Sequence, residues 1–364
     1  MIYLKICVYA ICKNEEKFIK RWYESVKQAD GIYVLDTGST DNSVQLLKSL
    51  GVNVKKEIIN PWRFDVARNK SLEMIPDYFD VCICLDLDEV LEDGWYQQLR
   101  NLWKEGLTRI RYVYNWSLDK NNKPIISFYG EKIHARKGFT WVNPVHEILK
   151  YEKTEKLLYT DKIIINHYPD NKKSRSSYLP LLELAIKENP ENDRNMHYLG
   201  REYMYYGEYE KAISTLEKHL NLKSATWHDE RCASMRFIAR SYMQLNRPKE
   251  ALMWSNLAIK ESPYLRDAYM EKALITYELK DYKETEKLCR ESLKIKKHPK
   301  TYINEAFTTD LSIYDILSVA CFYNGKIKAS LNYVNRALDL DNDNERLINN
   351  KKIIKNALSK KRID

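Results

Sequence analysis

The sequence predicts an α/β domain followed by an all-α domain built from helical repeats. Its length of 364 residues exceeds what one hydrophobic core usually serves, which favours at least two domains. Strand-like and helix-like segments alternate over the first part of the chain, whereas the segments after about Tyr178 all have helical spacing. We therefore expect an α/β domain over residues 1–170 and a helical repeat domain over residues 171–364.

The α/β prediction rests on apolar segments of strand length that are separated by helical ones. The segment Val81–Leu85 is continuously apolar, which is typical of a strand buried on both faces of a parallel sheet. A sheet of this kind binds its ligands at the carboxyl ends of the strands. The expected strands are Ile2–Ile11, Ile32–Leu35, Val52–Ile59 and Val81–Leu85, and the expected helices are Lys13–Ala29, Asn42–Leu50 and one that starts at Arg68.

An internal repeat marks the second domain. Small residues, aromatic residues and a turn residue recur at matching offsets in two well-matched units and two poorer ones. The interval from Ala251 to Thr285 is 34 residues (285 − 251), and the flanking intervals are longer by insertion. A helix-turn-helix unit of this length resembles the tetratricopeptide repeat, and an unrelated helical bundle is the alternative. The turn positions are Gly207, Asn246, Lys280 and Gly325, and Leu182–Pro190 resembles the second half of a further unit.

Charge and composition narrow the classes of partner. The chain has 60 Lys and Arg against 51 Asp and Glu, and this net charge of +9 suits an anionic ligand such as a nucleotide. No basic stretch interleaved with aromatic residues precedes the short C-terminal tail, so no nucleic acid is expected as a partner. The seven cysteines form no CxxC pair, and no segment has the roughly 20 apolar residues of a membrane span. We expect a reduced, cytoplasmic protein with no transmembrane segment.

Two acidic motifs follow strand-like segments, namely VLDTGSTD (Val34–Asp41) and CLDLDEVL (Cys84–Leu91). Carboxylates at strand ends are costly unless they bind a partner, and Asp86 and Asp88 point the same way because they lie two residues apart. Such a pair suits a divalent cation beside a diphosphate, because the cation neutralises the charge of a diphosphate leaving group. The alternative is that one of these aspartates only caps the helix that follows.

These motifs, together with ICKNEEKFI after the first strand and FDVARNKSL further on, resemble the family-two glycosyltransferases of the GT-A fold. The similarity extends over Met1 to about Arg100 and is greatest to the branch with bacterial β-glucosyltransferases of cell-surface glycans. It implies an inverting transfer from a nucleotide sugar, commonly a UDP-sugar such as UDP-glucose or UDP-N-acetylglucosamine. It also implies Mn²⁺ or Mg²⁺ as the cofactor.

The resemblance further implies a set of residues at the donor site. They are, in chain order, Cys12, Lys13, Asn14, Glu15, Asp36, Arg68, Asp86 and Asp88. The first four would lie under the nucleoside, and Asp36 would accept a hydrogen bond from the base. Arg68 would contact the base or the diphosphate, Asp86 would face the ribose and the metal, and Asp88 would bind the metal. The alternatives are a helix cap at Asn14–Glu16 and a surface helix charge at Arg68.

An inverting transferase also needs a base that deprotonates the acceptor. Glu147, in the triplet VHE of FTWVNPVHEILKY, is our candidate, because such triplets recur in similar transferases. Asp119 and Glu131 are competing carboxylates. A surface or salt-bridged role is the alternative for Glu147.

Three more side chains in this region are candidates for the site. His167 ends an apolar run, as would suit a metal ligand that arrives from the last strand of the domain, with a structural role as the alternative. His146 is a candidate to hydrogen-bond the donor phosphates. Trp141 is a natural floor for a sugar ring, and core packing is its alternative.

The helical repeats would offer a concave surface that holds a peptide or protein acceptor, with Arg201, Arg240 and Lys272 as candidate contacts. A homodimer through the repeats is another use of the same surface. This architecture resembles bacterial and phage enzymes that glycosylate peptides, including the S-glycosyltransferases of bacteriocin precursors. Transfer to a peptide or protein is therefore the leading expectation. The alternatives are a transferase that builds surface polysaccharide or lipid-linked glycan, and a non-catalytic repeat scaffold.

Overall fold

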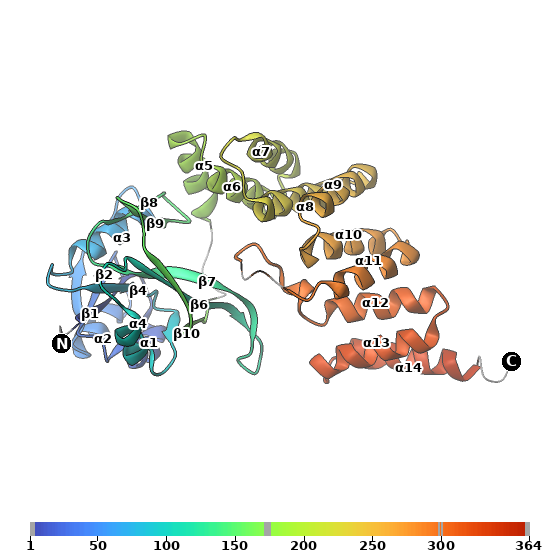
Figure 1. The fold of residues 1–364 in the computed structure, drawn as a ribbon, viewed down its shortest axis with the longest axis horizontal. Coiled ribbons are helices and arrows are strands. Elements are labelled where there is room, and N and C mark those ends of the chain that lie inside the picture. Colours follow the sequence, from blue (N-terminus) through green and yellow to red (C-terminus); the bar gives the residue numbers. More distant parts are fainter. Residues whose placement is uncertain (1–3, 171–175, 298, 300, 361–364) are drawn as a thin grey trace. The chain divides into compact units, whose positions relative to one another are not determined.

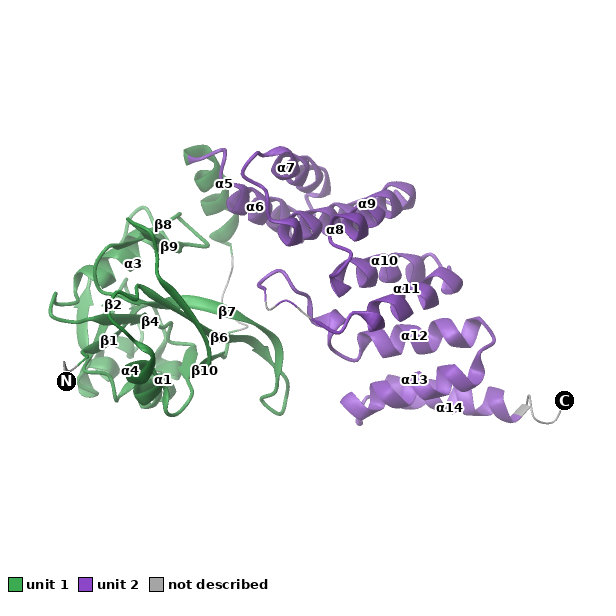
Figure 2. Ribbon diagram, in the orientation of Figure 1, with its two compact units in different colours: residues 1–188 green, residues 189–364 purple. Residues whose placement is uncertain are grey.

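The computed structural model describes residues 4–170, 176–297, 299 and 301–360. The chain forms two compact units that divide between Glu188 and Asn189 (Figure 1, Figure 2). Unit 1 (residues 1–188) is a mixed α/β fold and unit 2 (residues 189–364) is helical, which confirms the predicted fold class. The expected boundary at residue 170 differs from this division by one helix, α5 (Tyr178–Glu188), which overlaps the expected half repeat. The limits 1–170 and 171–364 for separate domains remain a prediction.

Unit 1 is built on a large sheet and a small one, whose strands are β1 (Ile6–Cys12), β2 (Gly31–Asp36), β3 (Asn53–Lys56), β4 (Val81–Cys84), β5 (Glu89–Leu91), β6 (Arg109–Leu118), β7 (Pro124–Ala135), β8 (Phe139–Val142), β9 (Ile148–Tyr151) and β10 (Leu157–His167). The large sheet has the order β3-β2-β1-β4-β7-β6-β10-β5, and β8 pairs only with β9. β3, β2, β1 and β4 run parallel, as the sequence predicts, although Ile2 and Tyr3 of the first expected strand lie outside the described residues. β7 runs antiparallel to β4 and β6, β10 runs parallel to β6, and β5 pairs antiparallel with β10.

The strand β1 lies between two hydrophobic cores, because its side chains alternate between the faces of the sheet. Ile6 and Val8 pack in a core with α1 (Glu16–Val26), α2 (Ser43–Ser49) and α4 (Trp95–Leu102), whose largest buried side chain is Trp22. Cys7 and Tyr9 face the opposite core, which contains α3 (Phe64–Glu73) and the β8–β9 hairpin. Burial on both faces explains why β1 and β4 are apolar throughout (Figure 1).

The described residues of unit 2 form four helix pairs and a final helix. The first helices of successive pairs pack against one another as well as against their own partners. We call the row of first helices the inner row and the row of second helices the outer row. The inner row is α6 (Asp193–Tyr205), α8 (His228–Gln244), α10 (Arg266–Glu278) and α12 (Ser312–Tyr323); the outer row is α7 (Tyr209–Asn221), α9 (Pro248–Glu261), α11 (Tyr282–Lys294) and α13 (Ile327–Leu340); and α14 (Glu345–Lys360) follows.

The predicted repeat is confirmed by the turns inside the four pairs. Gly207, Asn246, Lys280 and Gly325 have positive φ angles of 77°, 56°, 62° and 74°. In each turn the next backbone N–H donates to the carbonyl five residues earlier, at 2.8 to 2.9 Å. This is the Schellman arrangement that ends a helix on a left-handed residue. The four helix pairs therefore share one turn geometry, even where the turn residue is Asn or Lys rather than Gly.

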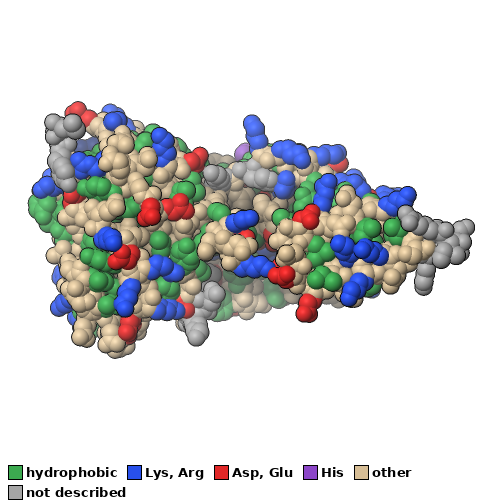
Figure 3. All heavy atoms as spheres, turned by 90° about the horizontal axis from the view of Figure 1, so that it is seen from below, with side chains coloured by type: hydrophobic (Ala, Val, Ile, Leu, Met, Phe, Trp, Pro, Cys, Tyr) green, Lys and Arg blue, Asp and Glu red, His purple; other side chains and the backbone are tan. Residues whose placement is uncertain are grey.

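On the face shown in Figure 3, basic and acidic side chains are interspersed. The seven cysteines are buried free thiols. Across the ranges that the structure describes, no helix combines the length and apolar character that crossing a membrane requires.

Close approach of the paired helices yields the first prediction. A Cβ atom on Gly200 of α6 would lie 2.5 Å from Cγ of the buried Leu216 of α7. The substitution Gly200→Ala should therefore destabilise unit 2 by about 1–3 kcal/mol, the usual cost of overpacking a core. Urea unfolding followed by circular dichroism measures this change. The exposed Lys218→Ala in α7 is the control and should change the free energy of unfolding by less than about 0.5 kcal/mol; equal effects of both variants would contradict the close approach.

Candidate active site

Three of the expected motifs meet at the carboxyl edge of the parallel strands. β1 ends at Cys12 and β2 at Asp36, and these two residues are paired across the strands. β4 ends at Cys84 and leads directly to Asp86 and Asp88. Because parallel strands end at the same edge, residues that are distant in sequence become neighbours. The structure thus brings these expected donor-site motifs together.

Hydrogen bonds fasten the loop after β1 to the loop after β2. The Asp36 carboxylate is only 1% exposed and accepts from the backbone N–H groups of Gly38 at 3.2 Å and Ser39 at 3.2 and 3.3 Å. The Oδ1 atom of Asn14 accepts from the backbone N–H of Thr40 at 2.7 Å. The backbone N–H of Asn14 in turn donates to Ser39 Oγ at 2.9 Å. Asp36 and Asn14 therefore shape this edge by binding backbone.

The rest of the segment after β1 is divided between the interior and the surface. Cys12 is buried, and burial raises the pKa of its thiol to about 12, so the group is neutral and not a thiolate nucleophile. Lys13 is exposed, and the backbone N–H of Glu15 donates to Ser43 Oγ at 2.8 Å. Contact between this segment and a nucleoside stays a prediction.

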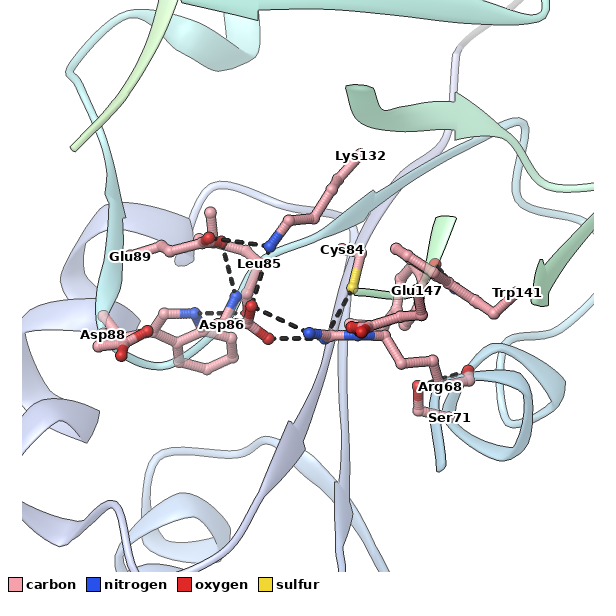
Figure 4. Close-up of polar contacts among 12 residues, drawn as sticks. Arg68, Ser71, Cys84, Leu85, Asp86, Asp88, Glu89, Lys132, Trp141 and Glu147 are labelled. Carbon is pink, nitrogen blue, oxygen red and sulfur yellow. Dashed lines mark hydrogen bonds and ion pairs between the residues drawn. The ribbon is translucent and has the colours of Figure 1, made fainter. Parts of the chain in front are cut away.

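Arg68 of α3 is the centre of a buried charge cluster (Figure 4). Its side chain is only 6% exposed, so the surface-charge alternative is wrong. Nη1 and Nη2 donate to the two carboxylate oxygens of Asp86 at 2.6 and 3.0 Å, and Nε donates to Glu147 Oε1 at 2.7 Å. Nη1 also lies 3.2 Å from Cys84 Sγ. One guanidinium thus joins α3, the end of β4 and the loop before β9.

Lys132 of β7 is a second cation in this cluster, and no sequence motif marks it. Its Nζ lies 2.9 Å from Asp86 Oδ2 and 2.8 Å from Glu89 Oε1. Glu89 is 2% exposed, and its other oxygen accepts from the backbone N–H of Asp86 at 2.9 Å. The hydroxyl of Tyr114 in β6 also donates to Glu89 at 2.8 Å. Strand alternation puts Lys132 and its neighbour Glu131 on opposite faces, but alternation alone does not show which face meets the site.

The two cations fix the ionisation state of Asp86. Burial alone would raise the pKa of its carboxyl group, but the charges of Arg68 and Lys132 outweigh burial and hold the pKa far below its usual range. For Glu89 the balance is reversed, because burial raises the pKa more than Lys132 lowers it. Asp86 is therefore a permanently charged and firmly oriented carboxylate.

Asp88 lies beside His167, the last residue of β10, and the two side chains come from distant parts of the sequence. Nε2 of His167 is 3.6 Å from Asp88 Oδ2, and Nδ1 is 3.0 Å from the carbonyl oxygen of Trp116. The His167 ring stacks on the Trp116 indole with a centroid separation of 4.6 Å. Burial lowers the pKa of His167, but the interactions with Asp88, with the Trp116 carbonyl and with the charge of Glu89 together outweigh burial, so the pKa is raised overall. The structure thus brings together both expected metal-binding residues.

The donor set of Asp88 and His167 fits a divalent cation. When Nδ1–H donates to the Trp116 carbonyl, the Nε2 lone pair is directed towards Asp88, which is the arrangement of a metal-binding histidine. Within the described residues, no group of three or more His, Cys, Asp or Glu side chains is arranged to hold a metal. A cation here would therefore take its remaining ligands from substrate or water.

The candidate base, Glu147, is positioned by the docking of the β8–β9 hairpin on α3. The side chain of Asn69 accepts from the backbone N–H of Trp141 at 2.8 Å and donates to its carbonyl at 2.9 Å. The backbone N–H of Phe64 donates to the carbonyl of Pro144 at 2.9 Å. Arg68 and Asn69 of the RN motif therefore act together, because one binds Glu147 and the other binds the hairpin that carries it.

Two of the other candidate side chains near Glu147 have structural contacts. Trp141 is 4% exposed and its Nε1 donates to the hydroxyl of Tyr9 at 2.9 Å, which favours its core-packing alternative over a floor for a sugar. His146 has a positive φ angle of 49°, and its ring lies 5.7 Å from the ring of Tyr178.

The competing carboxylates have other partners. Asp119 accepts from the backbone N–H groups of Asn121 and Lys123 at 2.7 and 2.8 Å, in the turn between β6 and β7. Glu131 accepts from Arg111 at 2.9 Å. Neither is in the cluster around Asp86, whereas Glu147 is.

Comparison with known proteins gives the class of unit 1. Residues 7–160 match the sequence model of the family Glycosyl transferase family 2. Unit 1 is therefore a family 2 glycosyltransferase domain with a GT-A-like fold, and the resemblance seen in the motifs is confirmed.

Curated relatives share this part of the chain. The "Uncharacterized glycosyltransferase RT0209" of Rickettsia typhi is 38% identical over 100 residues, which are 27% of this chain and 33% of that protein. The "Lipopolysaccharide core biosynthesis glycosyltransferase LpsC" of Rhizobium meliloti is 27% identical over 141 residues, which are 37% of this chain and 49% of that protein. The chain thus spans between a third and a half of the length of these relatives.

Solved structures resemble the helical half. The TPR protein TTC0263 of Thermus thermophilus aligns with 49% of this chain and 89% of its own, at 16% identity and a TM-score of 0.37. The Cut9–Hcn1 structure aligns over 51% of this chain and 33% of its own, at 14% identity and a TM-score of 0.41. The assignment of tetratricopeptide-like pairs in unit 2 rests on its four shared turns.

The Lys132 contacts lead to a second prediction. Lys132→Met removes one of the two cations that contact Asp86 and the cation that contacts the buried Glu89, so unit 1 should lose about 3 kcal/mol of stability. Lys132→Arg keeps the charge and should lose clearly less. Urea unfolding measures both, with the exposed Lys123→Met of the same hairpin as the control. If Met and Arg at position 132 destabilise the domain equally, shape rather than charge is what matters there.

Proposed function

We propose that the chain is an inverting, metal-dependent glycosyltransferase that moves a sugar from UDP-glucose or UDP-N-acetylglucosamine to a peptide or protein acceptor. The observation that carries this proposal is the site after β4. There Asp88 and His167 lie side by side, and Asp86 is oriented by Arg68 and Lys132. The match of residues 7–160 to a glycosyltransferase family supports the reaction class.

Asp88 and His167 would hold Mn²⁺ or Mg²⁺, since a carboxylate and a neutral imidazole suit such an ion. The cation would neutralise the charge that develops on the departing nucleoside diphosphate. The stacking of His167 on Trp116 keeps the imidazole in place before any ligand arrives. The pair is thus arranged in advance for the charge of the leaving group.

On the donor side, the fastened loops after β1 and β2 would receive the nucleoside. Cys12, Lys13, Asn14 and Glu15 would lie beneath it, and Asp36 would bind the base from its place at the end of β2. The nitrogen atoms of Arg68 already donate to Asp86 and Glu147, which favours a positioning role for this residue over direct contact with the diphosphate.

On the acceptor side, Glu147 would be the base. As the acceptor atom attacks the anomeric carbon and the nucleoside diphosphate leaves, Glu147 would take the proton of the acceptor. Its Oε1 is held at 2.7 Å by Arg68, which also holds Asp86. The base and the donor site would therefore keep a fixed separation.

A glycan acceptor is the second candidate. The Rhizobium meliloti relative is named as a lipopolysaccharide core biosynthesis glycosyltransferase. A transferase for surface or lipid-linked glycan would use the same donor site and differ only in the acceptor. Activity on glycan fragments but not on peptides would decide in its favour.

The metal proposal is tested at Asp88. Asp88→Ala removes one of the two protein ligands, so Mn²⁺-dependent hydrolysis of UDP-glucose and UDP-N-acetylglucosamine should fall to background. The fold should be unaffected, because Asp88 is partly exposed. Asp93→Ala, an exposed change in the turn after β5, is the control and should keep full activity. Near wild-type turnover by Asp88→Ala would exclude this residue as a metal ligand.

The base proposal is tested at Glu147. Glu147→Gln keeps the shape of the side chain but cannot take a proton, so transfer should fall by roughly 10²–10⁴-fold. Affinity for the UDP-sugar, measured by calorimetry, should hardly change. Glu152→Gln, at an exposed position in the same hairpin region, is the control. Weak donor binding together with normal turnover at saturation would instead make Glu147 a binding residue.

A further inference from the structure

In unit 2, the segment between α11 and α12 is longer than the repeat requires. The turn residues Asn246 and Lys280 are 34 positions apart (280 − 246), whereas Lys280 and Gly325 are 45 apart (325 − 280). The third interval therefore carries 11 additional residues (45 − 34). Insertions of this kind in a repeat array fold on one face, often the binding face. Here the segment Thr301–Thr309 lies against helices of the inner row.

The side chains of this segment are bound by residues of α6, α8 and α10. The hydroxyl of Tyr302 donates to Glu230 of α8, and the Tyr302 ring lies 4.5 Å below the guanidinium of Arg194 of α6. The Glu305 carboxylate accepts from Arg236 Nη1 at 3.0 Å and from Arg240 Nη2 at 2.7 Å, both in α8. An aromatic ring and a carboxylate three positions apart are thus each held by a charged partner.

The backbone of the segment is bound as well. Arg236 Nη2 donates to the carbonyl of Ile303 at 3.1 Å, and the backbone N–H of Glu305 donates to Asp267 Oδ1 at 2.8 Å. Arg266 Nη1 donates to the carbonyl of Thr308 at 3.0 Å. Side chains of a receptor that bind the main chain of an irregular segment are typical of peptide recognition rather than of helix packing.

The inner row beneath the segment is charged, which distinguishes it from a core interface. The Arg236 side chain is 0% exposed while the segment covers it, and its guanidinium pairs with Glu305 and, at 3.8 Å, with Asp267. Burying such charges costs free energy that water would return if the segment left. Release of the segment is therefore less costly than exposing an apolar core of equal size. Arg240 and Lys272, expected as exposed acceptor contacts, are instead paired with Glu305 or neighbouring helix residues.

We propose that α6, α8 and α10 of the inner row form a binding site for a peptide that carries an aromatic residue and, three positions later, a carboxylate. The segment Thr301–Thr309 occupies this site as an intramolecular ligand, and a partner protein with the same pattern competes with it. Arg236 and Arg240 bind the carboxylate, Glu230 binds the aromatic hydroxyl, and Asp267 and Arg266 bind the backbone. This inference concerns unit 2 alone and does not depend on the proposed transferase activity.

The experiment uses the full chain and a fluorescent peptide of residues 301–310, TYINEAFTTD. A tethered ligand has an effective concentration in the millimolar range, so the unaltered protein should bind the free peptide weakly. The double variant Tyr302→Ala/Glu305→Gln weakens the intramolecular ligand and should bind the peptide at least about tenfold more tightly. The control is Glu291→Gln, a half-exposed carboxylate of α11 that pairs with Lys294 in the same unit. The control peptide TAINQAFTTD should not bind either protein.

Hydrogen exchange on the unaltered protein tests the same point without a variant. The amides of residues 301–309 should exchange at least about tenfold faster than those of α8, because the segment opens without unfolding the array. Excess TYINEAFTTD should speed their exchange further. Equal protection of the segment and α8, or equal peptide affinity of the double variant and the unaltered protein, would overturn the proposal. Hydrolysis of UDP-sugars should be unchanged in the double variant, so a failure here is separate from a failure of the transferase proposal.

Discussion

The pair formed by Arg68 and Asp86 is the interaction on which the site depends. The Arg68 side chain is only 6% exposed, and a buried guanidinium is tolerated only when a carboxylate offsets the cost of removing its charge from water. The two oxygens of Asp86 supply most of that compensation. Lys132 adds the second cation that keeps Asp86 ionised, and Glu147 completes the set of carboxylates around Arg68. Because the four groups come from α3, the end of β4, β7 and the loop before β9, the position of each restrains the other three. Pre-organisation of this kind is what a site needs in order to stabilise charge that appears only during a reaction.

The same pair explains why the RN motif has two residues. Arg68 binds the carboxylates, while Asn69 binds the backbone of Trp141 and so fixes the β8–β9 hairpin on the outside of α3. Successive residues of a helix point about 100° apart, so one can face the sheet edge while the other faces the hairpin. The buried Trp141 of the hairpin donates a hydrogen bond to Tyr9 of β1 and so connects the hairpin to the sheet. Arg68 and Asn69 therefore connect the edge of the sheet to the hairpin that carries Glu147.

Much of the fold and part of the site were predictable from local pattern. The apolar strands, the acidic residues at their ends and the recurring turn positions are short-range features, and parallel strands necessarily bring their ends to one edge. Lys132 and Tyr114 were not predictable, because they lie on the long antiparallel strands β6 and β7, whose facing depends on tertiary pairing and irregular register. Arg68 was ambiguous for a related reason, since an arginine in a helix is usually exposed. The contacts of residues 301–309 with α8 join positions more than 60 residues apart in the sequence, and no periodic signal marks them.

Both units contain a buried arginine whose partners are remote in sequence, Arg68 in unit 1 and Arg236 in unit 2. The partners of the two arginines differ in how firmly the fold holds them. Asp86 lies at the end of a strand and cannot leave without disrupting the sheet, and Glu147 cannot leave unless the β8–β9 hairpin undocks from α3. Arg236 is covered by an inserted segment in which Tyr302, Ile303 and Phe307 reach the cores of unit 2. Ion pairs and hydrogen bonds also hold the segment, and water replaces such contacts at modest net cost when both partners become exposed. The first arginine is suited to a fixed site and the second to one that can exchange its ligand.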